Sequence, residues 1–267
     1  MIILLKLLIS FCTFLISFSF MFSVPQAHSS SRSKYETSGQ VIWEVNTKEK
    51  LVSLTFDDGP SSTFTPQILD LLAKHNAKAT FFITGINANK YPQMLKRMVK
   101  EGHELGNHTY NHFSNKNISA KKLSNELNLT SRAIKRITGV DTTLFRPVGG
   151  TLNDTIVNTA SQHNYLVVIW SWHQDPKDWR RSSAYTISNH VIKNLQNGDI
   201  ILLHDAGGNR TQTVRALNTI LNDLDKNGYK CVTVSELIYR SEIKKQDNRH
   251  MFPYKSKSLL NGNLQFD

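Results

Sequence analysis

The chain has 267 residues, of which 39% are hydrophobic and 20% are charged, with 13 glycines and 7 prolines. This composition excludes a wholly disordered chain, a collagen-like repeat and a coiled coil. Lysine and arginine total 32 against 21 acidic residues, which gives a formal net charge of +11. Such a balance favours an anionic partner: nucleic acid, a membrane surface or a charged cell-wall polymer.

The N-terminal segment narrows this choice. Residues 1–24 are almost wholly apolar, with Lys6 as their only charge, and a stretch of small residues follows up to Ser29. This order is typical of an export signal, although residues 7–24 also reach the minimum length of a membrane-spanning helix. We therefore expect residues 1–29 to be a cleaved signal peptide or an N-terminal membrane anchor. The rest of the chain would be exported, and exported proteins rarely meet nucleic acid.

From about residue 50, short apolar runs alternate with segments whose apolar residues recur at helical spacing. This alternation predicts an α/β fold with parallel strands, either a βα barrel or a doubly wound sheet. We expect a tether over residues 30–49, one domain over residues 50–240 and a basic tail over residues 241–267. Cys231, in the last run, is predicted to be a buried structural thiol. The seven predicted strands are residues 51–56, 79–83, 103–106, 143–146, 166–170, 199–203 and 230–234.

Charged side chains stand at five of the predicted strand ends. The carboxyl ends of parallel strands meet at one edge of the sheet, where α/β proteins build their active sites. One such residue would mean little, but five at one edge indicate a site. They are Asp57 with Asp58, His108 with His112, Arg146, Asp175 and His204.

The first two clusters suit a metal centre. Asp57 and Asp58 begin a sequence that, alone, is typical of a turn, but adjacent carboxylates can also divide the work of binding a divalent cation and acting as a base. His108 and His112 are four residues apart, a spacing that lets both reach one metal, and the alternative is two solvated loop histidines. Two histidines and one carboxylate leave positions open for water and substrate.

The other clusters suit the remaining steps of a hydrolysis. A buried Arg146 would need a carboxylate partner, and the base aspartate is one, whereas the alternative is an Arg–Pro turn with a surface salt bridge. Gly149 would free backbone N–H groups for an oxyanion. Asp175 near His204 would raise the pKa of that histidine and keep it a general acid; otherwise the two are a turn starter and a strand-end histidine. Trp172 and Trp179 would offer flat walls to a sugar ring, although core packing is the usual reason for a tryptophan.

Taken in order, these segments resemble the five motifs of the polysaccharide deacetylase family, the NodB-homology group of carbohydrate esterases. The resemblance spans about residues 50–240 and implies an incomplete, distorted (β/α) barrel of about seven parallel strands. It also implies metal-dependent removal of acetyl groups from N-acetylated sugars. The segments are Thr55-Phe56-Asp57-Asp58-Gly59, His108-Thr109-x-x-His112, Arg146-Pro147-x-Gly149, Asp175-x-x-Asp178-Trp179 and Leu202-x-His204.

The resemblance assigns the metal and the base. Asp57 resembles the catalytic base of the family, and Asp58, His108 and His112 resemble its metal ligands. The implied cofactor is a divalent metal, Zn²⁺, with Co²⁺ or Ni²⁺ as functional substitutes.

The resemblance also assigns the groups around that centre. Arg146 resembles the residue that orients the base, His204 the general acid and Asp175 the carboxylate that tunes this acid. The substrate groove would be formed by Gly149, as backbone donor, and by Trp179 and Leu202, as walls.

Together these observations lead us to expect a monomeric hydrolase that lies on an anionic cell wall and acts on an N-acetylated glycan. Peptidoglycan is the first choice, through its N-acetylglucosamine or its N-acetylmuramic acid, and chitin oligomers are the second. The alternatives are an inactive protein that only binds cell-wall glycans and an amide hydrolase of the same fold that acts on small molecules.

Overall fold

The computed structural model describes residues 27–250. The chain divides into two compact units, residues 1–40 and residues 41–267. The first contains α2 (Ala27–Thr37), so part of the predicted tether is helical. Among the described residues, no helix combines the length and the apolarity that crossing a membrane requires. The predicted export segment lies outside the described residues up to residue 26.

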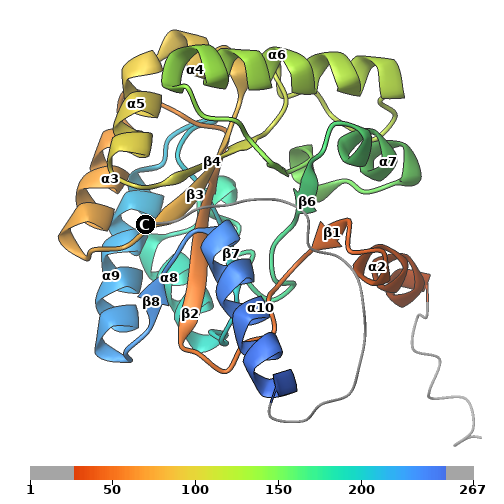
Figure 1. The fold of residues 1–267 in the computed structure, drawn as a ribbon. Coiled ribbons are helices and arrows are strands. Elements are labelled where there is room, and N and C mark those ends of the chain that lie inside the picture. Colours follow the sequence, from red (N-terminus) through yellow and green to blue (C-terminus); the bar gives the residue numbers. More distant parts are fainter. Residues whose placement is uncertain (1–26, 251–267) are drawn as a thin grey trace, which may run out of the picture. The chain divides into compact units, whose positions relative to one another are not determined.

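The second unit is built on a curved sheet of parallel strands (Figure 1). Seven strands follow one path in the order β1–β6–β5–β4–β3–β2–β7, and each neighbouring pair is parallel. An eighth strand, β8 (Lys230–Cys231), pairs with the beginning of β2. The strands of the path are β1 (Val41–Ile42), β2 (Leu51–Asp57), β3 (Ala79–Ile83), β4 (Glu104–Asn107), β5 (Leu144–Phe145), β6 (Leu166–Val168) and β7 (Ile200–His204).

The predicted incomplete barrel is confirmed, and the seven predicted strands are present as β2 to β8. In the part of the chain that the structure describes, β1 and β7 form no ladder with each other. An isolated bridge between Glu44 and Asp199 is what joins the chain after β1 to the chain before β7. The sequence analysis missed β1, because this strand has two residues and lies in the segment predicted to be a tether.

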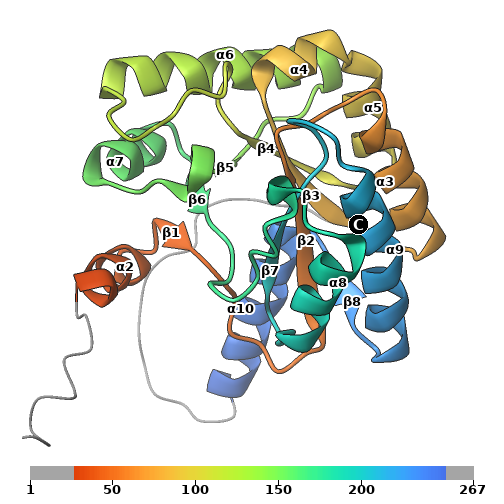
Figure 2. The same ribbon diagram turned by 180° about the vertical axis from the view of Figure 1, so that it is seen from behind.

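The connecting helices pack outside the sheet (Figures 1 and 2). Neighbouring helices contact one another in the succession α8–α9–α3–α5–α6–α7, which follows the strand order that they connect. Two short 3-10 turns, η1 (Val148–Gly150) and η2 (Asp178–Arg180), lie in the loops after β5 and β6. The helices are α3 (Phe64–Lys74), α4 (Gly85–Lys90), α5 (Pro92–Lys100), α6 (Ala120–Thr138), α7 (Asp154–Gln162), α8 (Ala184–Lys193), α9 (Thr211–Lys226) and α10 (Val234–His250).

The core fixes strand β2, which pairs with β3, β7 and β8, from both sides. Every residue of β2 is buried, as expected for a parallel strand covered on both faces. Phe56 stacks on Phe81 of β3 with ring centroids 5.0 Å apart, and Ile68 and Leu72 of α3 belong to the same cluster. The carboxyl end of β2, which carries Asp57, is therefore held rigidly.

The C-terminal elements differ from their predicted bounds. Strand β8 ends at Cys231 rather than at residue 234, because Thr233 Oγ1 accepts a hydrogen bond from the backbone N–H of Glu236 and caps α10. Burial raises the pKa of the Cys231 thiol to about 12, as suits the predicted structural role. Helix α10 crosses the predicted tail boundary at residue 240. Residues 251–267 of the predicted tail lie outside the described residues.

Candidate active site

Four of the predicted site residues lie at the carboxyl ends of four strands of the sheet. Asp57 ends β2 and His204 ends β7, and the two are direct partners in the parallel register. Their side chains therefore point to the same face of the sheet. His108 directly follows β4, and Arg146 directly follows β5.

Arg146 is fully buried beside Asp57. Its Nη1 donates to Asp57 Oδ1 at 2.8 Å and to Thr55 Oγ1 at 2.7 Å. Its Nε and Nη2 donate to the backbone oxygens of Val168 and Ile169 at 3.1 and 2.6 Å. These contacts satisfy a charge that would otherwise be costly to bury, and they fix the orientation of the Asp57 carboxylate.

Asp58, His108 and His112 converge on one point. Asp58 has φ of 74°, in the left-handed region, so its side chain leaves the direction of the strand. Its Oδ1 lies 2.8 Å from His112 Nε2 and 3.5 Å from His108 Nε2. Ligand atoms of the three residues all lie within 4.8 Å of one another. The structure therefore brings together the three residues for which the resemblance implies metal binding.

The hydrogen bonds of His108 orient it as a ligand. Its Nδ1 lies 2.7 Å from the backbone oxygen of Arg146, and since a carbonyl oxygen only accepts, Nδ1 carries the proton. Nε2, the nitrogen left for a metal, lies 3.5 Å from Asp58 Oδ1 and 3.8 Å from Asp57 Oδ2. An imidazole whose other nitrogen is fixed by a backbone carbonyl is typical of a metal-binding histidine.

The separations also suit a divalent metal. Two ligands at about 2.0–2.1 Å from a tetrahedral zinc ion lie roughly 3.3 Å apart, close to the 2.8 and 3.5 Å that separate Asp58 Oδ1 from the two histidine nitrogens. Burial raises the pKa of Asp58, but hydrogen bonds from His108 and His112 outweigh it, and the net pKa is well below the ordinary range. The same contact with Asp58 raises the pKa of His112. The three residues therefore fit a cation by distance and by charge.

The partner of His204 is Asp178, which corrects the expected pairing with Asp175. His204 Nδ1 lies 2.7 Å from Asp178 Oδ1, and the backbone N–H of His204 donates to Asp178 Oδ2 at 2.9 Å. Thr213 Oγ1 donates to the same Oδ2 at 2.8 Å. Asp175 instead accepts the backbone N–H of Lys177 within its own turn, at 3.0 Å.

The physical reason for this correction is a local reversal of the chain. Lys177 has φ of 53°, and Asp178 then begins η2 and is buried. The turn therefore directs Asp178 inward and leaves Asp175 to stabilise the loop. Asp178 belongs to the same motif as Asp175, and the sequence alone does not distinguish two aspartates three residues apart.

Asp178 sets the protonation of His204. Burial lowers the pKa of this imidazole, but the hydrogen bond and the charge of Asp178 outweigh it, followed by the charges of Asp57 and Asp58. The net effect raises the pKa of His204 to about 9. At neutral pH the side chain is thus a protonated imidazolium, the form that a general acid needs.

Asp205 is a buried carboxyl group that the sequence analysis left without a role. Its Oδ2 accepts from Thr65 Oγ1 at 2.5 Å, and its backbone oxygen accepts from Ser61 Oγ at 2.8 Å. Burial raises its pKa to about 7. Gly59 packs so closely on it that a side-chain carbon there would lie 2.2 Å from Oδ1. Asp205 therefore fastens the turn after Asp58 to the end of β7.

The three predicted groove residues lie around the loops of this edge. Leu202 is two residues before His204, on the same face of β7, and is 3% exposed. Trp179 directly follows Asp178 and is 44% exposed. Gly149, at φ of 64° in η1, has no atom within 4 Å of the position of a side chain. Their roles toward a substrate stay predictions.

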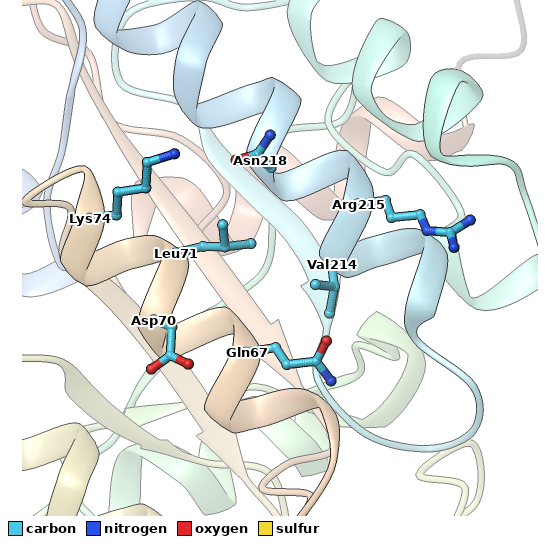
Figure 3. A pocket seen from close by; sticks show the side chains of 7 residues that line it. All are labelled: Gln67, Asp70, Leu71, Lys74, Val214, Arg215 and Asn218. Atoms are coloured by element: carbon cyan, nitrogen blue, oxygen red, sulfur yellow. The ribbon is translucent and has the colours of Figure 1, made fainter.

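A surface groove of about 520 Å³ lies elsewhere, between α3 and α9 (Figure 3). None of the predicted site residues lines it, and its lining combines charged, amide and aliphatic side chains of two helices. The lining residues are Gln67, Asp70, Leu71, Lys74, Val214, Arg215 and Asn218.

Comparison of the sequence with known proteins identifies relatives of this chain. The sequence profile of the polysaccharide deacetylase family matches residues 44–168. A peptidoglycan-N-acetylglucosamine deacetylase of Bacillus cereus is 49% identical over 207 residues, which cover 78% of this chain and 97% of that protein. A peptidoglycan-N-acetylmuramic acid deacetylase of Bacillus subtilis is 40% identical and covers 76% of this chain and 41% of that protein.

A solved structure extends the similarity to the fold. The crystal structure of a peptidoglycan N-acetylglucosamine deacetylase superposes with a TM-score of 0.73 at 35% identity, covering 77% of this chain and 96% of that one. The similarity therefore extends over most of this chain and nearly all of the solved one.

Proposed function

Because this chain belongs to the polysaccharide deacetylase family, we propose that it hydrolyses the N-acetyl groups of N-acetylglucosamine in cell-wall peptidoglycan and releases acetate. The Bacillus cereus relative that shares 49% identity is named as a deacetylase of this substrate. The observation that carries the proposal is the convergence of Asp58, His108 and His112 beside an Asp57 carboxylate fixed by Arg146. N-acetylmuramic acid and chitin oligomers are the alternative substrates.

The residues that would hold the metal are Asp58, His108 and His112, and we propose zinc as the ion. When bound, the ion would supply a Lewis acid for the acetamide oxygen and for the attacking water. His112, whose side chain is 42% exposed, lies on the solvent side of the three. Two histidines and one carboxylate leave positions open to water and substrate.

Asp57 would act as the base. Arg146 holds Oδ1, and Oδ2 faces the metal-ligand cluster at 3.8 Å from His108 Nε2. Oδ2 would accept a proton from the attacking water as its oxygen forms a bond to the acetyl carbon. Arg146 keeps the carboxylate from rotating out of this position.

His204 would act as the acid. Its Nδ1 is engaged by Asp178, so Nε2 carries the proton that can be given away. As the bond between the acetyl carbon and the sugar nitrogen breaks, His204 would protonate that nitrogen. The products are acetate and an amino sugar, and one water is consumed.

The loops beside this centre would receive the sugar. Leu202 and Trp179 would contact the acetyl methyl and the sugar ring, and a backbone N–H near Gly149 would stabilise the negative oxygen of the tetrahedral intermediate. The exposed ring of Trp179 and the open surroundings of Gly149 support these positions.

We also propose that the enzyme works outside the cytoplasm, as a secreted, cell-wall-associated or membrane-anchored protein. The support is the apolar segment of residues 1–24 and the basic charge of the remaining chain. N-terminal sequencing of the protein recovered from culture medium and from membranes would show whether residues 1–29 are cleaved, as in a secreted protein, or kept, as in a membrane-anchored one.

The proposed activity is tested by measuring acetate release from peptidoglycan, chitin oligomers and acetylated xylan, with and without a chelator. We expect chelator-sensitive release that is fastest on peptidoglycan, and none from the Asp57→Asn variant. Binding of peptidoglycan without acetate release would instead support the inactive glycan-binding alternative. Release only from small acetamides would support the small-molecule alternative.

A further inference from the structure

A buried carboxylate of α6 holds the loop between the two histidines of the cluster. Glu126 Oε2 accepts the backbone N–H groups of Tyr110 and Asn111 at 2.9 and 2.7 Å. Its Oε1 accepts Asn111 Nδ2 at 2.8 Å. The side chain is 3% exposed, and both of its oxygens accept hydrogen bonds from this one loop.

The same loop is held from its other side by α4. The backbone N–H groups of Gly85 and Ile86 donate to the backbone oxygens of Thr109 and Tyr110, both at 3.0 Å. Tyr110 packs against Gly85, where a side-chain carbon would lie 2.2 Å from its ring. The loop is thus fixed through its carbonyls by α4 and through its N–H groups by Glu126.

The loop needs such restraint, because its backbone is strained. Thr109 and His112 have φ of 67° and 57°, in the left-handed region that residues other than glycine seldom adopt. Strained residues persist only where surrounding contacts determine them. His112 is exposed, so its place opposite Asp58 depends on the backbone that Glu126 holds.

We propose that Glu126 is a positioning residue that sets His112 against Asp58 and His108 and thereby tunes the affinity for the metal. The inference rests on the metal site of the proposed function. What matters is the reach of the carboxyl group to Tyr110 and Asn111, rather than its negative charge.

Two substitutions of Glu126 separate the effect of its side-chain length from the effect of its negative charge. Glu126→Asp keeps the charge but withdraws both oxygens by one methylene, and it should weaken zinc binding by about 10- to 100-fold, the usual effect of losing a group that orients a metal ligand. Glu126→Gln keeps the reach: its amide oxygen can accept both backbone N–H groups, and its NH₂ can donate to Asn111 once that amide turns over. Its zinc affinity should stay closer to the wild-type value than that of Glu126→Asp.

Glu104→Asp is the matched control. Glu104, at the opposite end of β4, also accepts three hydrogen bonds, from Thr80 and Ser235, and touches no residue of the cluster. The Glu104→Asp variant should lose thermal stability and keep the zinc affinity of the wild type. If Glu126→Asp fails to fold, Asn111→Ala removes one of the three hydrogen bonds and should weaken zinc binding about fivefold.

The measurement is zinc affinity by competition with a chromophoric chelator, on metal-free full-length protein whose fold is checked by circular dichroism. Wild-type affinity in Glu126→Asp, or a greater loss in Glu126→Gln than in Glu126→Asp, would overturn the inference. If Glu126→Asp does not fold, wild-type affinity in Asn111→Ala would overturn it. A wild-type protein that binds no zinc would remove the proposed metal site and this inference with it, whereas zinc binding that is insensitive to Glu126 would remove the inference alone.

Discussion

Replacing Asp178 by asparagine should move the high-pH limit of deacetylation downward. His204 must be protonated to donate to the leaving nitrogen, so activity falls as pH rises through its pKa. In the native protein this pKa is about 9, because the Asp178 hydrogen bond and charge outweigh burial. Asparagine keeps an oxygen for Nδ1 but removes the charge, and burial then acts to lower the pKa.

The size of the effect follows from the two pKa values. The ordinary pKa of histidine, 6.5, serves as the reference for the variant, against about 9 in the native site. The difference corresponds to roughly 3 kcal/mol in favour of the protonated form. At pH 8 the protonated fraction would fall from about nine-tenths to about 3%, so activity should drop roughly 30-fold at this pH and less at pH 6.

The assay is acetate release from peptidoglycan between pH 5.5 and 10, with wild type, Asp178→Asn and Asp175→Asn at saturating zinc. Asp175 accepts a hydrogen bond from the N–H of Lys177 in its own turn rather than from His204, so Asp175→Asn should keep the wild-type profile. Identical high-pH limits in Asp178→Asn and wild type would refute the reasoning, as would a shift in Asp175→Asn alone.

Three further predictions concern stability and metal. Arg146→Met leaves the Asp57 carboxylate buried without its partner and should lower the free energy of unfolding by about 3–5 kcal/mol in urea titrations, whereas a loss below 1 kcal/mol would contradict the buried pair. His204 has a raised pKa in the fold, so the stability it gains from Asp178 is complete below pH 6.5 and is lost as pH rises through about 9. The difference in unfolding free energy between wild type and Asp178→Asn should therefore narrow between pH 6 and pH 9.5, and a constant difference would refute this linkage. Removal of metal by a chelator should abolish acetate release and added zinc should restore it, while His112→Ala should bind zinc more weakly; unchanged zinc content would exclude His112 as a ligand.

The sheet was predictable because short apolar runs alternate with segments of helical periodicity. Residues 51–56 form one such run, which predicts a buried strand, and aspartates that directly follow a parallel strand are expected at the edge of the sheet where active sites form. Strand β1 was not predicted, because a strand of two residues shows no periodicity in the sequence. It is recognised only through its pairing with β6, which is a contact between distant parts of the chain.

The site was predictable to the level of its motifs and of the Asp57–Arg146 pair, but not to the partner of His204. Asp175 and Asp178 both lie in one motif, and the left-handed backbone at Lys177 decides which of them meets His204. The role of Glu126 was not predictable from the sequence, since a glutamate in a helical segment is usually a solvated residue. Its role depends on how α6 packs against the loop after β4.

The most direct test of the central claim is mass spectrometry of peptidoglycan fragments after incubation with the purified zinc-loaded chain. The account predicts glucosamine in place of N-acetylglucosamine, with an equal amount of free acetate, and no change with Asp57→Asn. Glycan strands that keep every acetyl group, although they bind the protein, would contradict it.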